Sequence, residues 1–206
     1  MITLSAIQES ALREIGNIGA GHAATALSQL MGKKIGIAVP TVRVVHVMDF
    51  LKELDSKQPV AGVYFKVVGD MSGGILFYLA KEDGCRLVDA LLKLEFGATK
   101  EFGTLEESAI KETGSILSAS YLGAISALSG MTLIPSVPRY LLESLARVFR
   151  TTFEKQMEIS KTLIAVENVF IEATIRVTGY FLLMPDEDGL FRMLQRLSGT
   201  KEWRIA

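Results

Sequence analysis

The stretch ESALREIGNIG at residues 9–19 recurs as ESAIKETGSIL at residues 107–117. Ser10 and Glu14 therefore reappear 98 positions later, as Ser108 and Glu112. Pro40 likewise corresponds to Pro138. A match that extends over so much of the chain indicates an internal duplication. We expect one domain made of two structural repeats, residues 1–98 and residues 99–206.

Each half is expected to contain the same elements in the same order. A capping box at Ser5 with Gln8, and another at Thr104 with Glu107, would begin two long helices. Gly32 and Gly130, by their position, would end these helices. Further along, the pattern predicts strands at 35–47 and 131–137, hairpins at 60–68 with 74–80 and 163–172 with 176–184, and closing helices at 81–94 and 187–197.

Residues 139–156 break the symmetry, because helical periodicity there has only the short counterpart 49–54 in the first half. The extra helix is a candidate for a task that only one half performs. A lid over the sheet is the alternative.

Composition excludes several classes of protein. The 206 residues carry a formal charge of −1, which gives no reason to expect nucleic acid or an anionic membrane as a partner. The single cysteine, Cys85, cannot form an intramolecular disulfide, and we expect the reducing cytoplasm. Residues 113–138 lack charge over a length that suits a membrane span, but their serines and glycines favour a buried helix followed by a strand.

Ser10, Glu14, Asn17 and Gly21 are spaced to lie on one stripe of the first helix. The opposite face is apolar and should be buried; it holds Leu12, Ile15, Ile18, Ala20, Ala23, Leu27 and Leu30. In the second half Ser108, Glu112 and Ser115 form the matching stripe. Glycines inside a helix are costly, so Gly16, Gly19 and Gly114 predict a close approach between the two long helices. A loop at 16–21 is the alternative.

The stripe offers a carboxylate and a carboxamide one turn apart. The Asn17 amide can hold a water in line with a reactive centre, and the Glu14 carboxylate can pair with a cation of a partner. A merely solvated surface would look the same. No metal site is expected, because His22, on the apolar side of the first helix, and His46 lie far apart in the sequence. The glycine-rich GAGHAA at 19–24 follows a helix and not a strand, which argues against nucleotide binding.

The spacing Ser10-x3-Glu14-x2-Asn17-x22-Pro40 resembles the motif of the CheC, CheX and FliY family of chemotaxis phosphatases, and the duplicated plan is most similar to its CheC branch. The resemblance implies an α/β fold of the α+β type, in which an antiparallel sheet carries the two motif helices side by side on one face. It implies hydrolysis of the aspartyl phosphate of the response regulator CheY. The Mg²⁺ ion would belong to CheY, and this chain would need no cofactor or metal of its own.

By the same resemblance, Glu14 would bind the active-site lysine of CheY and Asn17 would orient the attacking water. Ser10, Gly21 and Ser108 would contact the substrate. Glu112 would serve a weaker second site in which Ser115 replaces the family's asparagine and cannot present both a carbonyl and an amide.

The resemblance also implies the deamidase CheD as a partner in a heterodimer. Because the helix within 139–156 breaks the symmetry, we expect it to be the contact, and we expect the chain to be monomeric alone. A non-catalytic adaptor that binds CheY, CheD or the flagellar switch is the alternative function.

Overall fold

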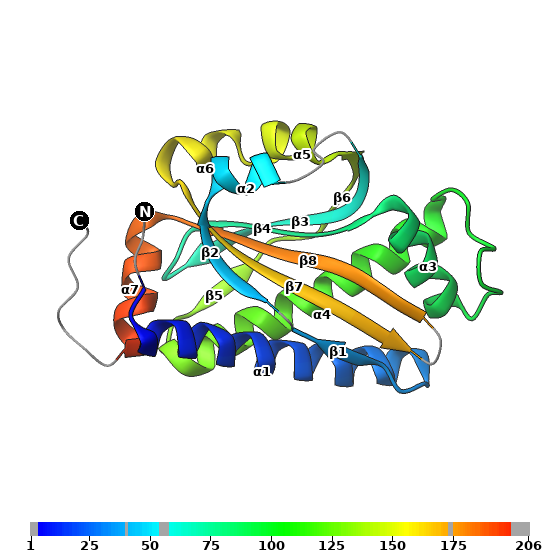
Figure 1. The fold of residues 1–206 in the computed structure, drawn as a ribbon, viewed down its shortest axis with the longest axis horizontal. Coiled ribbons are helices and arrows are strands. Elements are labelled where there is room, and N and C mark those ends of the chain that lie inside the picture. Colours follow the sequence, from blue (N-terminus) through cyan, green and yellow to red (C-terminus); the bar gives the residue numbers. More distant parts are fainter. Residues whose placement is uncertain (1–3, 40, 54–57, 173–174, 199–206) are drawn as a thin grey trace.

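One antiparallel sheet of eight strands runs through the protein and carries helices on both faces (Figure 1). The structure is a computed structural model that describes residues 4–39, 41–53, 58–172 and 175–198. The strands are β1 (Gly36–Ala38), β2 (Val42–His46), β3 (Pro59–Gly69), β4 (Gly73–Ala80), β5 (Leu133–Pro135), β6 (Arg139–Ser144), β7 (Thr162–Glu172) and β8 (Ile175–Pro185). The helices are α1 (Ala6–Met31), α2 (Val47–Glu53), α3 (Lys81–Leu92), α4 (Thr104–Ser129), α5 (Leu145–Thr152), α6 (Glu154–Ile159) and α7 (Glu187–Ser198).

The two halves of the chain interlock in this sheet. Its order is β1-β7-β8-β4-β3-β5, with β2 also paired to β7 and β6 to β3. The first strands of each half thus extend the hairpin of the other half. At the centre, β4 and β8 pair antiparallel, with Phe77 opposite Phe181. The division into two repeats, residues 1–98 and 99–206, stays a prediction. In the structure, the strands of both halves contribute to one shared sheet.

Strand residues alternate between two cores, as the period of two in a strand requires. In β4, Ile75 and Phe77 face a core shared with α1, α3, α4 and α7. Leu76 and Tyr78 face a smaller core on the other side, which α2 and α5 cover. The long helices α1 and α4 lie side by side against the first face (Figure 1). This is the α+β arrangement that the sequence predicted.

The ends of the long helices follow from their sequences. Ser5 and Gln8 form the predicted capping box of α1. Gly32 and Gly130 both adopt the left-handed conformation that ends a helix, each with φ of 65°. The start predicted for α4 is wrong by one residue, since Gly103 precedes the helix and its N–H donates to Glu106 at 2.9 Å. Glycine has no side chain, so only half of a capping box exists there.

Residues 139–156 are not one helix, contrary to the prediction. Residues Arg139–Ser144 form β6, which pairs with β3 over six residues, as β2 pairs with β7. The pairing with a distant strand overrides the local helical periodicity. The helical part, α5 followed by α6, buries Leu145, Val148 and Phe149 against the second face of the sheet. The structure therefore supports the alternative interpretation, in which this helical segment covers the sheet as a lid.

Three other predictions can be compared with the structure. The strand expected at 35–47 is divided into β1 and β2, and Val47 already begins α2. Residues 113–138 hold the end of α4 followed by β5, as predicted. In the part of the chain that is described, no helix has the length and apolar character that a membrane span requires.

Candidate functional site

The polar stripe of α1 faces solvent, as its spacing predicted. Ser10, Glu14, Asn17 and Gly21 are all exposed. Within the described residues, the Glu14 carboxylate and the Asn17 amide have no hydrogen-bond or ion-pair partner. Since one helical turn separates them, both can contact the same group of a partner. Glu14 and Asn17 are thus exposed polar groups on one helix that are available to bind a partner.

Two glycines let α1 approach its neighbours on the buried side. A Cβ at Gly16 would lie 2.9 Å from Val42 Cγ2 of β2. A Cβ at Gly19 would lie 2.8 Å from Cε1 of Tyr121, a residue of α4. The predicted close contact between the long helices therefore occurs at Gly19, whereas Gly114 of α4 faces Val63 of the sheet. The helix continues through residues 16–21, so the alternative of a loop is wrong.

Tyr121 fixes the place where the helices cross. Its ring stacks on Phe181 of β8, with centroids 4.5 Å apart, and its hydroxyl donates to the Asn168 side-chain oxygen of β7. Burial raises the pKa of the Tyr121 hydroxyl above its usual range. The ring that meets Gly19 is therefore held by the sheet below it, and Asn17 lies only two residues from this contact.

The second stripe, on α4, is exposed only in part. Ser108 and Glu112 are exposed, but Ser115 is half-buried. The Ser115 hydroxyl donates to the Lys111 carbonyl of its own helix at 2.8 Å, and Ser108 does the same to Thr104 at 2.8 Å. The side chain at the position of Asn17 is thus shorter and already hydrogen-bonded within its helix.

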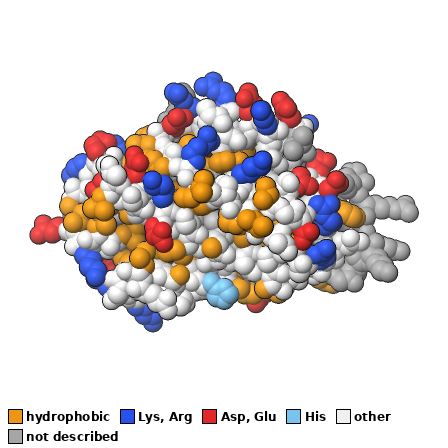
Figure 2. Space-filling view, turned by 180° about the vertical axis from the view of Figure 1, so that it is seen from behind, with side chains coloured by type: hydrophobic (Ala, Val, Ile, Leu, Met, Phe, Trp, Pro, Cys, Tyr) orange, Lys and Arg blue, Asp and Glu red, His pale blue; other side chains and the backbone are white. Residues whose placement is uncertain are grey.

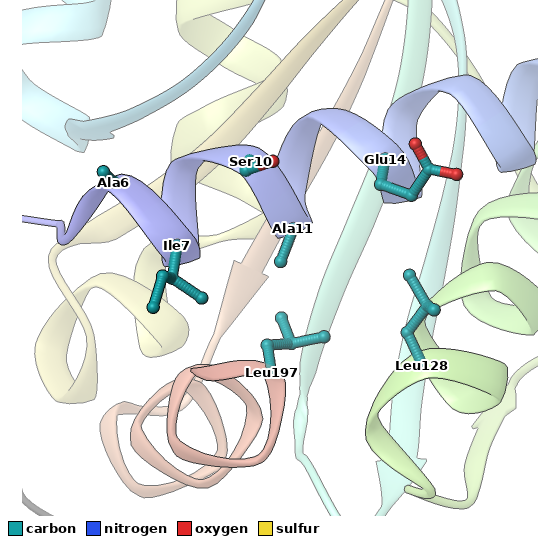
Figure 3. A pocket seen from close by; sticks show the side chains of 7 residues that line it. All are labelled: Ala6, Ile7, Ser10, Ala11, Glu14, Leu128 and Leu197. Carbon is teal, nitrogen blue, oxygen red and sulfur yellow. The ribbon is translucent and has the colours of Figure 1, made fainter. Parts of the chain in front are cut away.

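The two stripes are separate sites. The start of α1 lies beside the end of α4, as Leu128 and Ile7 line a common hollow, so the helices run antiparallel (Figure 3). Glu14 and Glu112 then lie on opposite sides of the Gly19–Tyr121 crossing. A rise of about 1.5 Å per residue puts them roughly 20 Å apart along the helices. A single phosphoryl group cannot contact both.

A hollow of about 540 Å³ adjoins the α1 stripe. Ser10 and Glu14 form part of its wall, and the other lining residues are Ala6, Ile7, Ala11, Leu128 and Leu197. In Figure 3, Ile7 and Ala11 of α1 point toward Leu197 of α7, while Leu128 of α4 points toward Glu14. Sequence reasoning missed these apolar residues because they come from three helices.

Some expectations about single residues need correction. Leu30 is not on the buried face of α1 but is 56% exposed, and His22 is exposed too. Both lie at the border of the apolar stripe, where helical spacing alone does not decide burial. Pro40 of the motif lies outside the described residues.

The distribution of charge on the face drawn in Figure 2 indicates no further site. The face in Figure 2 shows basic and acidic side chains interspersed among apolar ones, without a field of one sign. Among the described residues, no three His, Cys, Asp or Glu side chains form a group that could hold a metal ion. Cys85 is half-buried, and burial raises the pKa of its thiol, which makes it less reactive.

Comparison with known proteins agrees with the motif. Residues 7–44, which include the α1 stripe, match the model of the CheC-like family. The chain is 28% identical over 200 residues to the CheY-P phosphatase CheC of Bacillus subtilis (strain 168), covering 94% of this chain and 95% of that protein. It is also 28% identical over 140 residues to the flagellar motor switch phosphatase FliY of the same organism, covering 66% of this chain and 36% of FliY.

The fold has a close counterpart among solved structures. Thermotoga maritima FliY superimposes with a TM-score of 0.75 at 22% identity, covering 96% of this chain and 99% of that one. Together with the sequence matches, this confirms the resemblance that the Ser10, Glu14 and Asn17 spacing indicated. The chain is similar to the chemotaxis phosphatases CheC and FliY of Bacillus subtilis, and its residues 7–44 match the CheC-like family.

Proposed function

We propose that this chain hydrolyses the aspartyl phosphate of the response regulator CheY, and that the α1 stripe performs the reaction. The observation that carries the proposal is the exposed pair Glu14 and Asn17, which has no partner within the described chain. It lies in the segment that matches the CheC-like family. One relative, which matches over 94% of the chain, is named a CheY-P phosphatase.

In the proposed reaction each side chain has a separate role. The Glu14 carboxylate binds the active-site lysine of CheY in a charge-assisted pair, which docks α1 over the phosphoryl group. The Asn17 carboxamide accepts from and donates to a water molecule, and so holds it in line with the phosphorus–oxygen bond. The water oxygen bonds to phosphorus, one water proton passes to a phosphoryl oxygen, and the bond to the aspartate oxygen breaks. The aspartate leaves as its carboxylate, and inorganic phosphate is released.

The reaction requires no general acid or general base from the stripe. Ser10 and Gly21 contact the partner on either side of the pair. The Mg²⁺ ion of CheY neutralises charge on the phosphoryl oxygens, and this chain positions the attacking water.

The α4 stripe, in this proposal, binds CheY without hydrolysing its phosphate. Glu112 keeps the carboxylate, and Ser108 keeps an exposed hydroxyl. Ser115 offers a hydroxyl that already donates to the Lys111 carbonyl. This hydrogen bond favours the second candidate function, a non-catalytic adaptor, for the α4 half alone. Substitution Ser115→Asn should create a second active site, and in the Asn17→Ala background it should restore hydrolysis.

The proposal is tested by the decay of radiolabelled phospho-CheY in the presence and absence of the protein. We expect a shorter half-life with the wild-type chain. Glu14→Ala should weaken both affinity and turnover, because the lysine anchor is lost. If saturating protein leaves the half-life unchanged, with and without CheD, the chain is an adaptor and not an enzyme.

CheD is proposed as a regulatory partner, and the helical segment α5 as its contact. The apolar side of α5 belongs to the core, so a deletion would disturb the fold. Arg147 and Arg150 are exposed on its other side. Arg147 pairs with Glu143 at 3.0 Å, but a partly exposed ion pair of this kind contributes only about 0–1 kcal/mol, so changing it should leave the fold intact. The double variant Arg147→Glu and Arg150→Glu should lose CheD while it keeps CheY hydrolysis. CheD binding at wild-type affinity would refute this contact.

A further inference from the structure

The hollow beside Glu14 belongs to the same exposed face as the catalytic stripe. Ile7 is 57% exposed and Leu128 is 41% exposed, although both are large apolar residues. Leu197 lies half-buried at the base of α7 and completes the apolar wall. Apolar side chains gathered around a hollow mark a place where a partner removes them from water.

The polar part of the wall restricts what can enter. Ser10 and Glu14 form one side, so an occupant of the hollow lies directly next to the cation that Glu14 binds. A cavity of about 540 Å³ that opens to solvent can hold one or two side chains, whereas a whole helix cannot enter it. The occupant is therefore an apolar side chain adjacent to a basic one on the surface of a folded partner.

On the basis of the proposed function, we infer that this hollow is a specificity pocket for the receiver domain of the phosphorylated response regulator. It takes an apolar side chain that lies beside the lysine bound by Glu14. The Glu14 carboxylate both lines the hollow and binds the lysine. The side chain in the hollow should therefore come from the same partner as the lysine, which is the receiver domain. Apolar anchors in such pockets contribute most of the affinity of an interface, whereas the charged pair supplies orientation.

The internal match supplies matched controls for the test. Leu105 and Leu30 lie 98 positions from Ile7 and Leu128, and they are 62% and 56% exposed. They therefore flank the Glu112 stripe, at positions equivalent to those that Ile7 and Leu128 occupy beside Glu14. A change from leucine or isoleucine to serine alters the surface by a similar amount at all four positions. Only two of the four line the hollow.

The experiment compares Ile7→Ser and Leu128→Ser with Leu105→Ser and Leu30→Ser in the full chain. KM and kcat for phospho-CheY are measured first. Affinity for the receiver domain, activated with Mg²⁺ and beryllofluoride, is measured separately by titration of each variant in a Glu112→Ala background, so that the α4 stripe adds no second receiver site. We expect KM and Kd to rise about tenfold in the first two variants with kcat unchanged, and to change less than twofold in the controls.

The results separate this inference from the proposed function. If the wild-type chain does not hydrolyse phospho-CheY, only the proposed enzymatic function is refuted. The Kd values of the hollow variants, compared with those of the controls, still show whether the receiver domain uses the hollow. Equal affinities in the two sets of variants would overturn the inference. A change of oligomeric state in Ile7→Ser or Leu128→Ser without a change in receiver affinity would overturn it too, since the occupant would then be a second copy of this chain.

Discussion

The contact between Gly19 and Tyr121 leads to a quantitative prediction for Gly19→Ala. The added Cβ would lie 2.8 Å from Cε1 and 3.0 Å from Cγ of Tyr121, and closer still to Cδ1. The ring cannot turn away, because it stacks on Phe181 and its hydroxyl is bound to Asn168. Such overpacking costs about 1–3 kcal/mol, whereas alanine gains about 1 kcal/mol over glycine as a helix former.

Gly123→Ala provides the matched control. Gly123 lies inside α4, and a Cβ there would meet no atom within 4 Å. This variant should therefore gain about 1 kcal/mol of stability from helix propensity alone. The two glycine-to-alanine variants should differ by about 1–3 kcal/mol, the overpacking term.

Urea denaturation followed by circular dichroism measures this difference. Thermal unfolding should show it as about 2–4 °C for each kcal/mol in a chain of this size. If Gly19→Ala is stabilised as much as Gly123→Ala, α1 and α4 do not approach as the structure has them. The position of the α1 stripe relative to α4 would then be wrong.

Two further predictions concern buried polar groups. Tyr121→Phe should lower the free energy of unfolding by about 1–3 kcal/mol, because the Asn168 oxygen loses its donor; a loss below the error of urea denaturation would contradict this hydrogen bond. Burial raises the pKa of Asp89, but hydrogen bonds from Thr99 and from the Gly97 and Ala98 amides outweigh it and hold the pKa below the ordinary 3.8. Its contribution is present above the unfolded pKa and lost as the pH falls through the folded one, so the stability advantage of wild type over Asp89→Asn should shrink between pH 7 and pH 3. An advantage independent of pH would refute this.

Local signals in the sequence predicted most of the helices and hairpins. Ser5 with Gln8, Gly32 and Gly130 determine helix ends through contacts within a few residues, and such contacts can be read from the chain. The strand β6 could not be predicted in this way. Its residues have helical spacing, and only the pairing with β3, about 80 positions away, makes them a strand.

The stripe of the candidate site was predictable because one helix carries it. Ser10, Glu14 and Asn17 need only the helical period to lie on one face. The hollow was not predictable in the same way, because Leu128 and Leu197 come from helices far along the chain. A signal did exist, since Ile7 and Leu128 repeat at Leu105 and Leu30 with the spacing of the motif.

The central claim is that catalysis resides at Asn17 and not at Ser115. The most direct test is the rate of phospho-CheY decay at saturating protein for Asn17→Ala and Ser115→Ala, two truncations at equivalent positions. We expect Asn17→Ala to lose on the order of 100-fold in rate, because the water is no longer oriented. Ser115→Ala should keep the wild-type rate. Equal losses in the two variants, or a wild-type rate in Asn17→Ala, would contradict the claim.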